Sequence, residues 1–204
     1  MQSESSRTDP PDSELVERAV AGDLEAFAVI YRRYQHVVYR FGRVMTGCPA
    51  AAEDITQEVF VALFGELSRY DPGRASFTTY LYGIVRNLSR DRLRRERRFL
   101  GLDALGRGSR RAAYVDDPGE TLEGAELAGQ VRAALQKLPA RYRELIVLCD
   151  LHGLSYADAA AVVHISTAAV RSRLHRGRQL LRQRLSRVTR PASSRPVSPA
   201  RCPV

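Results

Sequence analysis

The sequence of residues 154–185 is LSYADAAAVVHISTAAVRSRLHRGRQLLRQRL, and it predicts two helices joined by a tight turn. Ser155, with Asp158 three residues later, is a typical helix start. The helix that follows is rich in alanine and valine, and such small side chains let a second helix cross closely. Ser166 or Thr167 is expected to begin that second helix. The pattern is typical of a helix-turn-helix, whose second helix contacts bases in the major groove.

The second of these helices is strongly basic. Between Arg171 and Arg190 there are eight arginines and no acidic residue. Arginine can bond guanine through two hydrogen bonds or neutralise phosphates, and we expect Arg173, Arg178 and Arg182 to contact phosphates. A solvated helix whose arginines only complement the helix dipole is the competing interpretation. The helix starts, the alanine-rich helix and the basic face together favour DNA binding.

The composition of the whole chain restricts its class. The 204 residues are 44% hydrophobic and carry a net charge of +9, which suits a polyanionic partner. Lys137 is the one lysine among 32 basic residues, a bias that a GC-rich genome would also produce. There is no apolar run of about 20 residues and no secretory signal, so we expect a cytosolic protein without membrane insertion. The three cysteines lack ligand spacing, and we expect no metal and no other cofactor.

Helical periodicity extends through the first half of the chain. Asp12 or Ser13 is expected to begin a first helix and Asp23 a second, whose apolar residues recur at steps of three and four. Further helices are expected from about Ala51 and over residues 77–99. No segment alternates between apolar and polar residues, so strands are not expected.

These patterns predict an all-α fold of two small helical domains joined by a flexible linker. The first domain covers residues 12–100 and the second residues 126–187. The stretch 101–125 between them is acidic towards its end and contains glycines, which is typical of a linker. Residues 1–11 and 188–204 are expected to be disordered tails.

Two further features of the first domain carry charge. Ten arginines and three acids lie between Arg86 and Arg111, downstream of several aromatic residues, a combination that suits single-stranded DNA. Core aromatics beside a solvated basic face would give the same pattern. Asp54 and Glu58 share one helical face, where a metal-dependent or acid/base site can be imagined, but no histidine accompanies them. A solvated or partner-binding face is the simpler interpretation, and we expect no catalytic residues.

Four segments together resemble the extracytoplasmic-function group of bacterial RNA polymerase sigma factors. They are DITQEVFVALF (54–64), FTTYLYGIVRNLSRDRLRR (77–95), LPARYRELIVLCDLHGLSYADAA (138–160) and AVRSRLHRGRQLLR (169–182). In that family the first two belong to region 2 and the last two to region 4. The resemblance implies a sigma factor that binds core polymerase, recognises promoters and helps to open them, without catalysing a reaction.

The resemblance also implies roles for individual residues. The largest-subunit clamp helices of core polymerase would contact Asp54, Gln57, Glu58 and Val61, and region 4 would meet the flap. The minus-ten element would contact Asp71, Arg74, Ser76, Phe77, Thr78, Tyr80, Arg86, Asn87, Arg90 and Arg94. The minus-thirty-five element would contact Ser166, Thr167, Arg171, Ser172, Arg173, His175, Arg176 and Arg178. An anti-sigma factor is a further expected partner.

The sequence departs from the family pattern at three places. Tyr80 stands where tryptophan is usual, although tyrosine still stacks on bases. His164 stands where glycine is common, and Ala168–Ala169 where Gly-Thr is common. A stand-alone helix-turn-helix regulator, which would bind duplex DNA as a dimer, and a metal-dependent nuclease acting through Asp54 and Glu58 are the alternatives.

Overall fold

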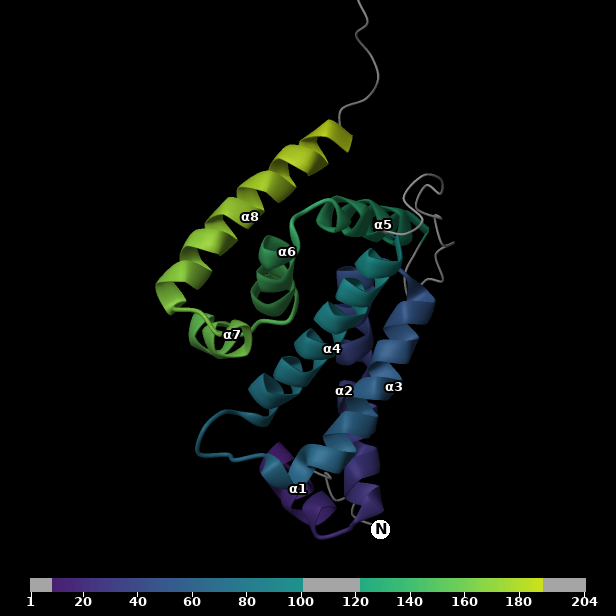
Figure 1. Cartoon of the computed structure of the whole chain (residues 1–204), viewed down its shortest axis with the longest axis vertical. Coiled ribbons are helices and arrows are strands. Elements are labelled where there is room, and N and C mark those ends of the chain that lie inside the picture. Colours follow the sequence, from purple (N-terminus) through teal and green to yellow (C-terminus); the bar gives the residue numbers. More distant parts are fainter. Residues whose placement is uncertain (1–8, 101–121, 189–204) are drawn as a thin grey trace, which may run out of the picture.

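The computed structural model describes residues 9–100 and 122–188, and in this part of the chain it contains helices and no strand. Figure 1 shows their arrangement. The first helical unit contains α1 (Asp12–Val20), α2 (Leu24–Thr46), α3 (Pro49–Glu66), the 3₁₀ turn η1 (Leu67–Arg69) and α4 (Phe77–Leu100). The second contains α5 (Leu122–Gln136), α6 (Ala140–Ile146), the π-helical turn η2 (Val147–Leu151), α7 (Tyr156–Val163) and α8 (Thr167–Val188). The all-α prediction is confirmed.

The ends of α1 and α2 follow from short-range chemistry, with one exception. Asp23 caps α2 as predicted, because its carboxylate accepts hydrogen bonds from the Glu25 and Ala26 amides at 2.9 and 3.1 Å. Gly47 ends α2 with a φ of 81°, a backbone conformation that favours glycine. The predicted helix α1 is present and begins at Asp12, but the predicted cap is wrong, because it follows Pro11 and neither Asp12 nor Ser13 caps it.

The predicted helix-turn-helix is present in the second unit. The Ser155 hydroxyl accepts a hydrogen bond from the Asp158 amide at 3.0 Å, and Ser166 accepts one from the Ala169 amide at 3.2 Å. His164 ends α7 with a φ of 57°, so the turn keeps its left-handed residue although histidine replaces glycine. Left-handed backbone costs a non-glycine residue about 1 kcal/mol.

The helical backbone changes pitch at the end of α6. After α6 the backbone widens into η2, where the His152 amide bonds the Val147 carbonyl at 3.0 Å, five residues back. Such π turns are rare and often occur at functional sites. The widened turn changes the direction of the chain before Gly153, and it brings His152 against the first unit.

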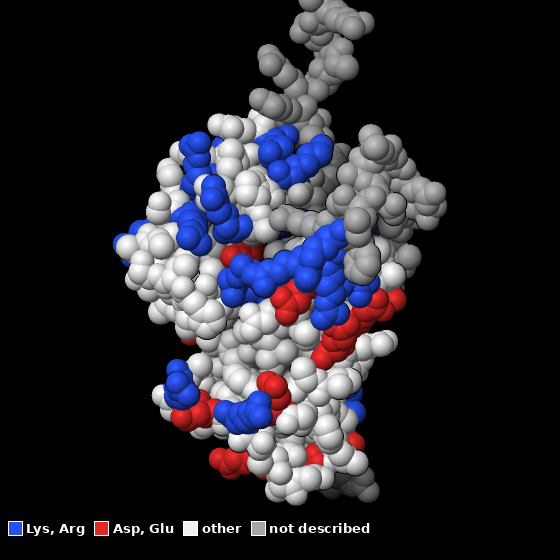
Figure 2. Space-filling model, in the orientation of Figure 1, with Lys and Arg blue, Asp and Glu red and all other residues white. Residues whose placement is uncertain are grey.

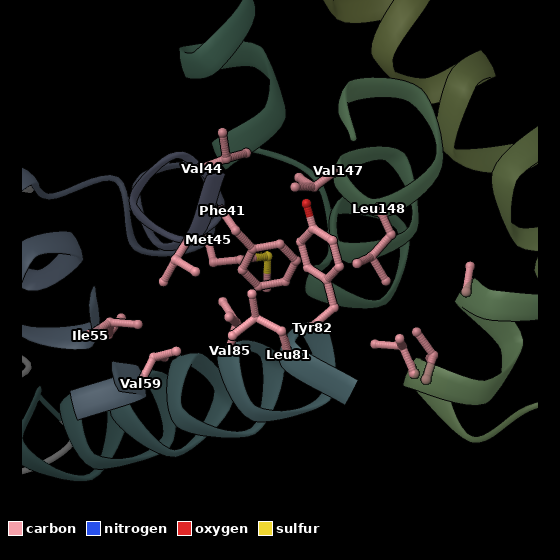
Figure 3. Packing of buried hydrophobic residues seen from close by; sticks show 14 of the residues in the cluster. Phe41, Val44, Met45, Ile55, Val59, Leu81, Tyr82, Val85, Val147 and Leu148 are labelled. Atoms are coloured by element: carbon pink, nitrogen blue, oxygen red, sulfur yellow. The ribbon is translucent and has the colours of Figure 1, made fainter. Parts of the chain in front are cut away.

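The apolar core is continuous between the two units. Figure 3 shows Phe41 and Met45 of α2 and Tyr82 of α4 directed towards Val147 and Leu148 of η2. Each of these side chains is at most 2% exposed, and all belong to one cluster of buried residues. The sequence predicts two units but not this contact between them. The linker prediction falls largely on residues 101–121, outside the described residues, and α5 begins at Leu122 within the predicted linker.

Candidate DNA and polymerase interfaces

Helix α8 presents one basic face to the surface. Val170 and Leu174 are at most 1% exposed and attach the helix to the second unit. Gly177 lies where α8 meets α6, since an added Cβ would lie 3.1 Å from an Ile146 methyl group. Of the side chains predicted to contact the minus-thirty-five element, Arg173 is half-buried. The others are exposed: Ser166, Thr167, Arg171, Ser172, His175, Arg176 and Arg178.

Arg178 of α8 forms an ion pair with Asp150. Its Nε donates to Asp150 of η2 at 3.0 Å, and its second nitrogen also bonds that carboxylate. The hydrogen bond to Asp150 raises the pKa of Arg178 well above its ordinary value. The pair holds the guanidinium at a defined place in the middle of α8.

The predicted minus-ten residues divide into exposed and buried groups. Asp71, Arg74 and Ser76 lie exposed in the loop before α4. Phe77 is 3% exposed, and its ring packs against Tyr34 and Tyr70 with centroids 5.4 and 5.7 Å apart. In this conformation the Phe77 ring belongs to the core, and its contact with DNA stays a prediction.

Tyr80 and Thr78 keep part of their surface accessible. Tyr80 is half-buried against the ring of Tyr70, and its hydroxyl donates to the Glu66 carbonyl at 3.1 Å. Thr78 is also half-buried, with its hydroxyl 3.4 Å from that of Tyr34. The Tyr34 hydroxyl in turn donates a hydrogen bond to the Asp12 carboxylate. Burial of Tyr34 is the larger cause, and this carboxylate the second, that raises the pKa of Tyr34 to about 12. Asp12 of α1 is thus bonded to Tyr34 of α2, whose hydroxyl also lies next to Thr78 at the start of α4.

The basic residues of α4 are not equally accessible. Asn87 and Arg94 are exposed, and Arg90 is half-buried. Arg86 is 4% exposed, and its Nε donates to Glu144 of α6 at 3.1 Å. Its terminal nitrogen donates to the Val163 carbonyl of α7 at 3.4 Å. The second unit covers the Arg86 side chain in this conformation, and its contact with the DNA backbone stays a prediction.

Two residues that sequence reasoning missed lie at the same contact. Glu144 is 5% exposed beside the apolar run 145–149, and a charged residue next to such a run is the signal that could have identified it. Asp158, predicted only as a helix start, also accepts a hydrogen bond from Thr79 of α4 at 3.1 Å. Both carboxylates therefore bind side chains of the first unit.

His152 completes this contact. Its ring packs beside those of Phe41 and Tyr82, with centroids 6.4 and 5.3 Å away. Its Nε2 is buried without a hydrogen-bond partner among the described residues. Burial and the nearby positive charge of Arg40 lower the pKa of His152 to about 4. The imidazole is therefore neutral at pH 7, as an apolar junction requires.

The four predicted polymerase-binding residues share an exposed face of α3. Asp54, Gln57, Glu58 and Val61 line a shallow hollow with Leu88 of α4, and Val61 is 74% exposed. We call these four residues the α3 face. An apolar strip continues from it, because Phe64 is 56% and Tyr31 of α2 39% exposed. These residues line a second hollow with Phe27, Gln57, Phe60 and Val61.

Charge surrounds the α3 face asymmetrically. Figure 2 shows acidic side chains over the first half of α3 beside a larger basic group over the C-terminal half of α4. Arg92 joins the two groups through a 3.1 Å ion pair with Asp54. Among the described residues, no three acidic, histidine or cysteine side chains cluster as metal ligands, and no helix is long and apolar enough to cross a membrane.

Comparison with known proteins identifies the family. Sigma-70 region 2 matches residues 30–99, and Sigma-70, region 4, matches residues 128–181. The ECF RNA polymerase sigma factor SigW of Bacillus subtilis (strain 168) is 32% identical, over 83% of this chain and 94% of its own length. SigE of Mycolicibacterium smegmatis is 36% identical over 78% of this chain, which spans 61% of that relative.

A solved structure agrees with these matches. CnrH, in complex with the cytosolic domain of CnrY, has a TM-score of 0.64 and 29% identity, covering 86% of this chain and 97% of CnrH. The chain belongs to the extracytoplasmic-function group of RNA polymerase sigma factors. The first helical unit therefore contains region 2, and the second contains region 4.

Proposed function

We propose that this sigma factor binds core polymerase through the α3 face and contacts promoter DNA at two places, through α4 and α8. The observation that carries the proposal is the outer face of α8. Arg171, Ser172, His175 and Arg176 follow each other at helical spacing on its first turns, and all four are exposed. A face of this kind fits the major groove, where arginine can bond guanine.

The α3 face supports the polymerase contact. Asp54, Gln57 and Glu58 offer carboxylate and amide oxygens around an exposed apolar residue, Val61. A central apolar residue inside a polar rim is typical of protein interfaces. The expected partner is the pair of clamp helices in the largest polymerase subunit, with region 4 contacting the flap.

The start of α4 supports contact with separated strands at the minus-ten element. The loop residues Asp71, Arg74 and Ser76 are exposed, and the half-buried ring of Tyr80 offers a surface for base stacking. Asn87, Arg90 and Arg94 lie further along the same helix, where they can meet the backbone. The protein contributes binding energy and performs no covalent chemistry, and it acts in the cytoplasm with the polymerase.

An anti-sigma factor is the proposed regulator. CnrH, 29% identical to this chain, is held in complex with the cytosolic domain of CnrY. The apolar strip of Tyr31, Phe60 and Phe64 beside the α3 face gives a partner helix a surface of suitable chemistry.

Run-off transcription with purified core polymerase and genomic promoter fragments tests the function. We expect the chain to direct selective transcripts from a subset of fragments. Asp54→Asn/Glu58→Gln should weaken core binding and transcription together, whereas Glu25→Gln, which removes an exposed carboxylate of α2, serves as the matched control. The absence of any selective transcript would refute the proposal.

Substitutions in α8 test the division between base and phosphate contacts. Arg171→Ala and Arg176→Ala should each cost about 1–3 kcal/mol of discrimination at the upstream element. Arg178→Ala should weaken binding to all sequences and reduce its salt dependence. Arg32→Ala on α2 is the control for loss of an exposed arginine. Equal behaviour of the three α8 variants would contradict the division.

A further inference from the structure

A chain of polar contacts joins α1 to the first turn of α4, where several of the predicted minus-ten residues lie. The Asp12 carboxylate of α1 accepts a hydrogen bond from the Tyr34 hydroxyl of α2. The same Tyr34 oxygen lies 3.4 Å from the hydroxyl of Thr78, the second residue of α4. The three side chains come from three different helices, so they meet only in the folded protein.

The carboxylate at the inner end of this chain is held in place. Its other oxygen accepts a hydrogen bond from Arg33, which also donates to the Pro10 carbonyl at 2.8 Å. A carboxylate paired with arginine has no proton to give and can only accept hydrogen bonds. Tyr34 is therefore the donor of its bond to Asp12. Burial, followed by this bond, raises the pKa of Tyr34 to about 12, so the hydroxyl keeps its proton at pH 7.

The ring of Tyr34 is held as well as its hydroxyl. It packs edge-on against Phe77 with centroids 5.4 Å apart, and Phe77 packs edge-on against Tyr70 at 5.7 Å. Phe77 directly precedes Thr78, so this packing fixes the first turn of α4 against α2. The phenol oxygen therefore stays beside the Thr78 hydroxyl.

The number of protons sets the direction of the chain. A tyrosine hydroxyl has one proton, and Tyr34 gives it to Asp12. Towards Thr78 the Tyr34 oxygen can only accept, so Thr78 is the donor of their contact. The proton of the half-buried Thr78 is therefore directed into the protein, and its oxygen keeps lone pairs for the accessible side.

We propose that Asp12 and Tyr34 are positioning residues for promoter selection, because they make the Thr78 hydroxyl an acceptor towards the minus-ten DNA. This proposal rests on the proposed function and on the predicted contact of Thr78 with that element. An acceptor selects a base edge that carries a proton. Adenine and cytosine have an amino group where guanine and thymine have a carbonyl oxygen. Thr78 therefore favours adenine over guanine, or cytosine over thymine, at one position of the element.

Two substitutions alter the chain in different ways. Tyr34→Phe removes the phenol oxygen and keeps the ring against Phe77, so the Thr78 hydroxyl becomes free to donate or accept. Asp12→Asn provides an oxygen that can accept from Arg33 and an amide group that can donate to Tyr34. The Tyr34 proton then turns to Thr78, whose own proton is left for the DNA. Tyr34→Phe should therefore relax the base preference, and Asp12→Asn should move it towards guanine or thymine.

Selection from a DNA library tests the proposal. The probe is a duplex from a promoter fragment that the holoenzyme transcribes, with the non-template bases of the minus-ten element single-stranded and randomised. Sequencing of the bound and unbound fractions gives the ratio of amino to carbonyl bases at each position. Wild-type holoenzyme should prefer amino bases at one position. Tyr34→Phe should lower that ratio about threefold to tenfold, as loss of one hydrogen bond allows, and leave the other positions unchanged.

A double variant separates positioning from folding. Thr78→Val removes the hydroxyl and keeps the shape of the side chain, so it should abolish the preference at that position. In the Thr78→Val background, Tyr34→Phe should have no further effect on the base ratios, because its influence passes through that hydroxyl. Two controls should keep the wild-type ratios. Tyr39→Phe changes another half-buried tyrosine of α2, and Asp23→Ala removes the distant cap of that helix.

The outcomes decide separate points. Wild-type ratios in Tyr34→Phe, combined with a preference that Thr78→Val abolishes, would overturn the proposal. Weaker binding to the whole library at unchanged ratios would also overturn it, and so would an equal change of ratios in Asp23→Ala, because both indicate a structural role alone. If Thr78→Val leaves every ratio unchanged, the predicted Thr78 contact is wrong, and the proposal with it. If wild-type holoenzyme selects no sequence at all, the proposed function itself is wrong.

Discussion

The α3 face and the covered side of α4 lie on neighbouring helices of region 2, yet their environments differ. Val61 on the α3 face is 74% exposed, whereas Arg86 on α4 is 4% exposed. The exposed surface presents carboxylates to solvent, and the covered one has a basic residue neutralised inside the protein. A side chain of α4 that was predicted to contact DNA is, in this conformation, part of the contact between the two units. Accessibility, rather than residue type, separates the two surfaces.

The largest change in stability is expected from a substitution in the apolar core that the two units share. Phe41 is fully buried and contacts both Tyr82 and His152, so Phe41→Ala should cost about 3–5 kcal/mol of unfolding free energy. Denaturant unfolding of the wild type should show one cooperative transition, measured by circular dichroism. Two separate transitions, with Phe41→Ala affecting only the first unit, would show that the regions do not share a core.

Acid should weaken the same junction through His152. Its folded pKa of about 4 lies below the ordinary 6.5, so its contribution to stability is complete above pH 6.5 and is lost as the pH falls towards 4. At about 1.4 kcal/mol per pKa unit, the loss is at most about 3 kcal/mol. The positive charge of Arg40 acts on the ring in the same direction as burial.

The control for the acid effect is His152→Gln. Carboxylates titrate in the same range in both proteins, so the difference between the two pH profiles isolates the histidine. Unfolding free energies from urea titrations between pH 7 and pH 4 provide the measurement. Parallel profiles would show that His152 is not buried in neutral form at the junction.

A helix cap far from the junction should have a smaller effect. Asp23→Ala removes the side chain that caps α2 and should destabilise region 2 by about 1 kcal/mol. Because the cap lies at the other end of α2 from Phe41, denaturant unfolding followed by circular dichroism should keep a single transition at a lower midpoint. A split transition would mean that the contact between the two units depends on this end of region 2 as well.

The smallest stability effect is expected at the exposed pair of Asp150 and Arg178. Asp150→Asn should change the unfolding free energy by less than about 1 kcal/mol, since exposed ion pairs contribute little. Removing this negative charge beside α8 should strengthen binding to duplex DNA of any sequence, measured by fluorescence anisotropy at several salt concentrations. Unchanged affinity would show that Arg178 does not contact phosphate.

Local patterns predicted much of the region 4 motif. The caps at Ser155 and Ser166 and the basic surface of α8 depend on neighbours within a few residues, and these were predicted. Asp12 shows the limit of this approach, because its carboxylate binds Arg33 and Tyr34 rather than its own helix end. A carboxylate that finds stronger partners from another helix does not cap, and no local pattern reveals that competition.

The helices, their order and the family could be predicted from the sequence, because helical periodicity, caps and charge runs depend on residues close together along the chain. Which of the predicted surfaces are accessible depends on the packing of the two units. The sequence around Phe77 and Arg86 does not indicate that either residue is buried. In the structure Phe77 packs against Tyr34 and Tyr70, and Arg86 bonds Glu144 and the Val163 carbonyl. Burial depends on partners that are distant along the chain and meet only when the two units pack together.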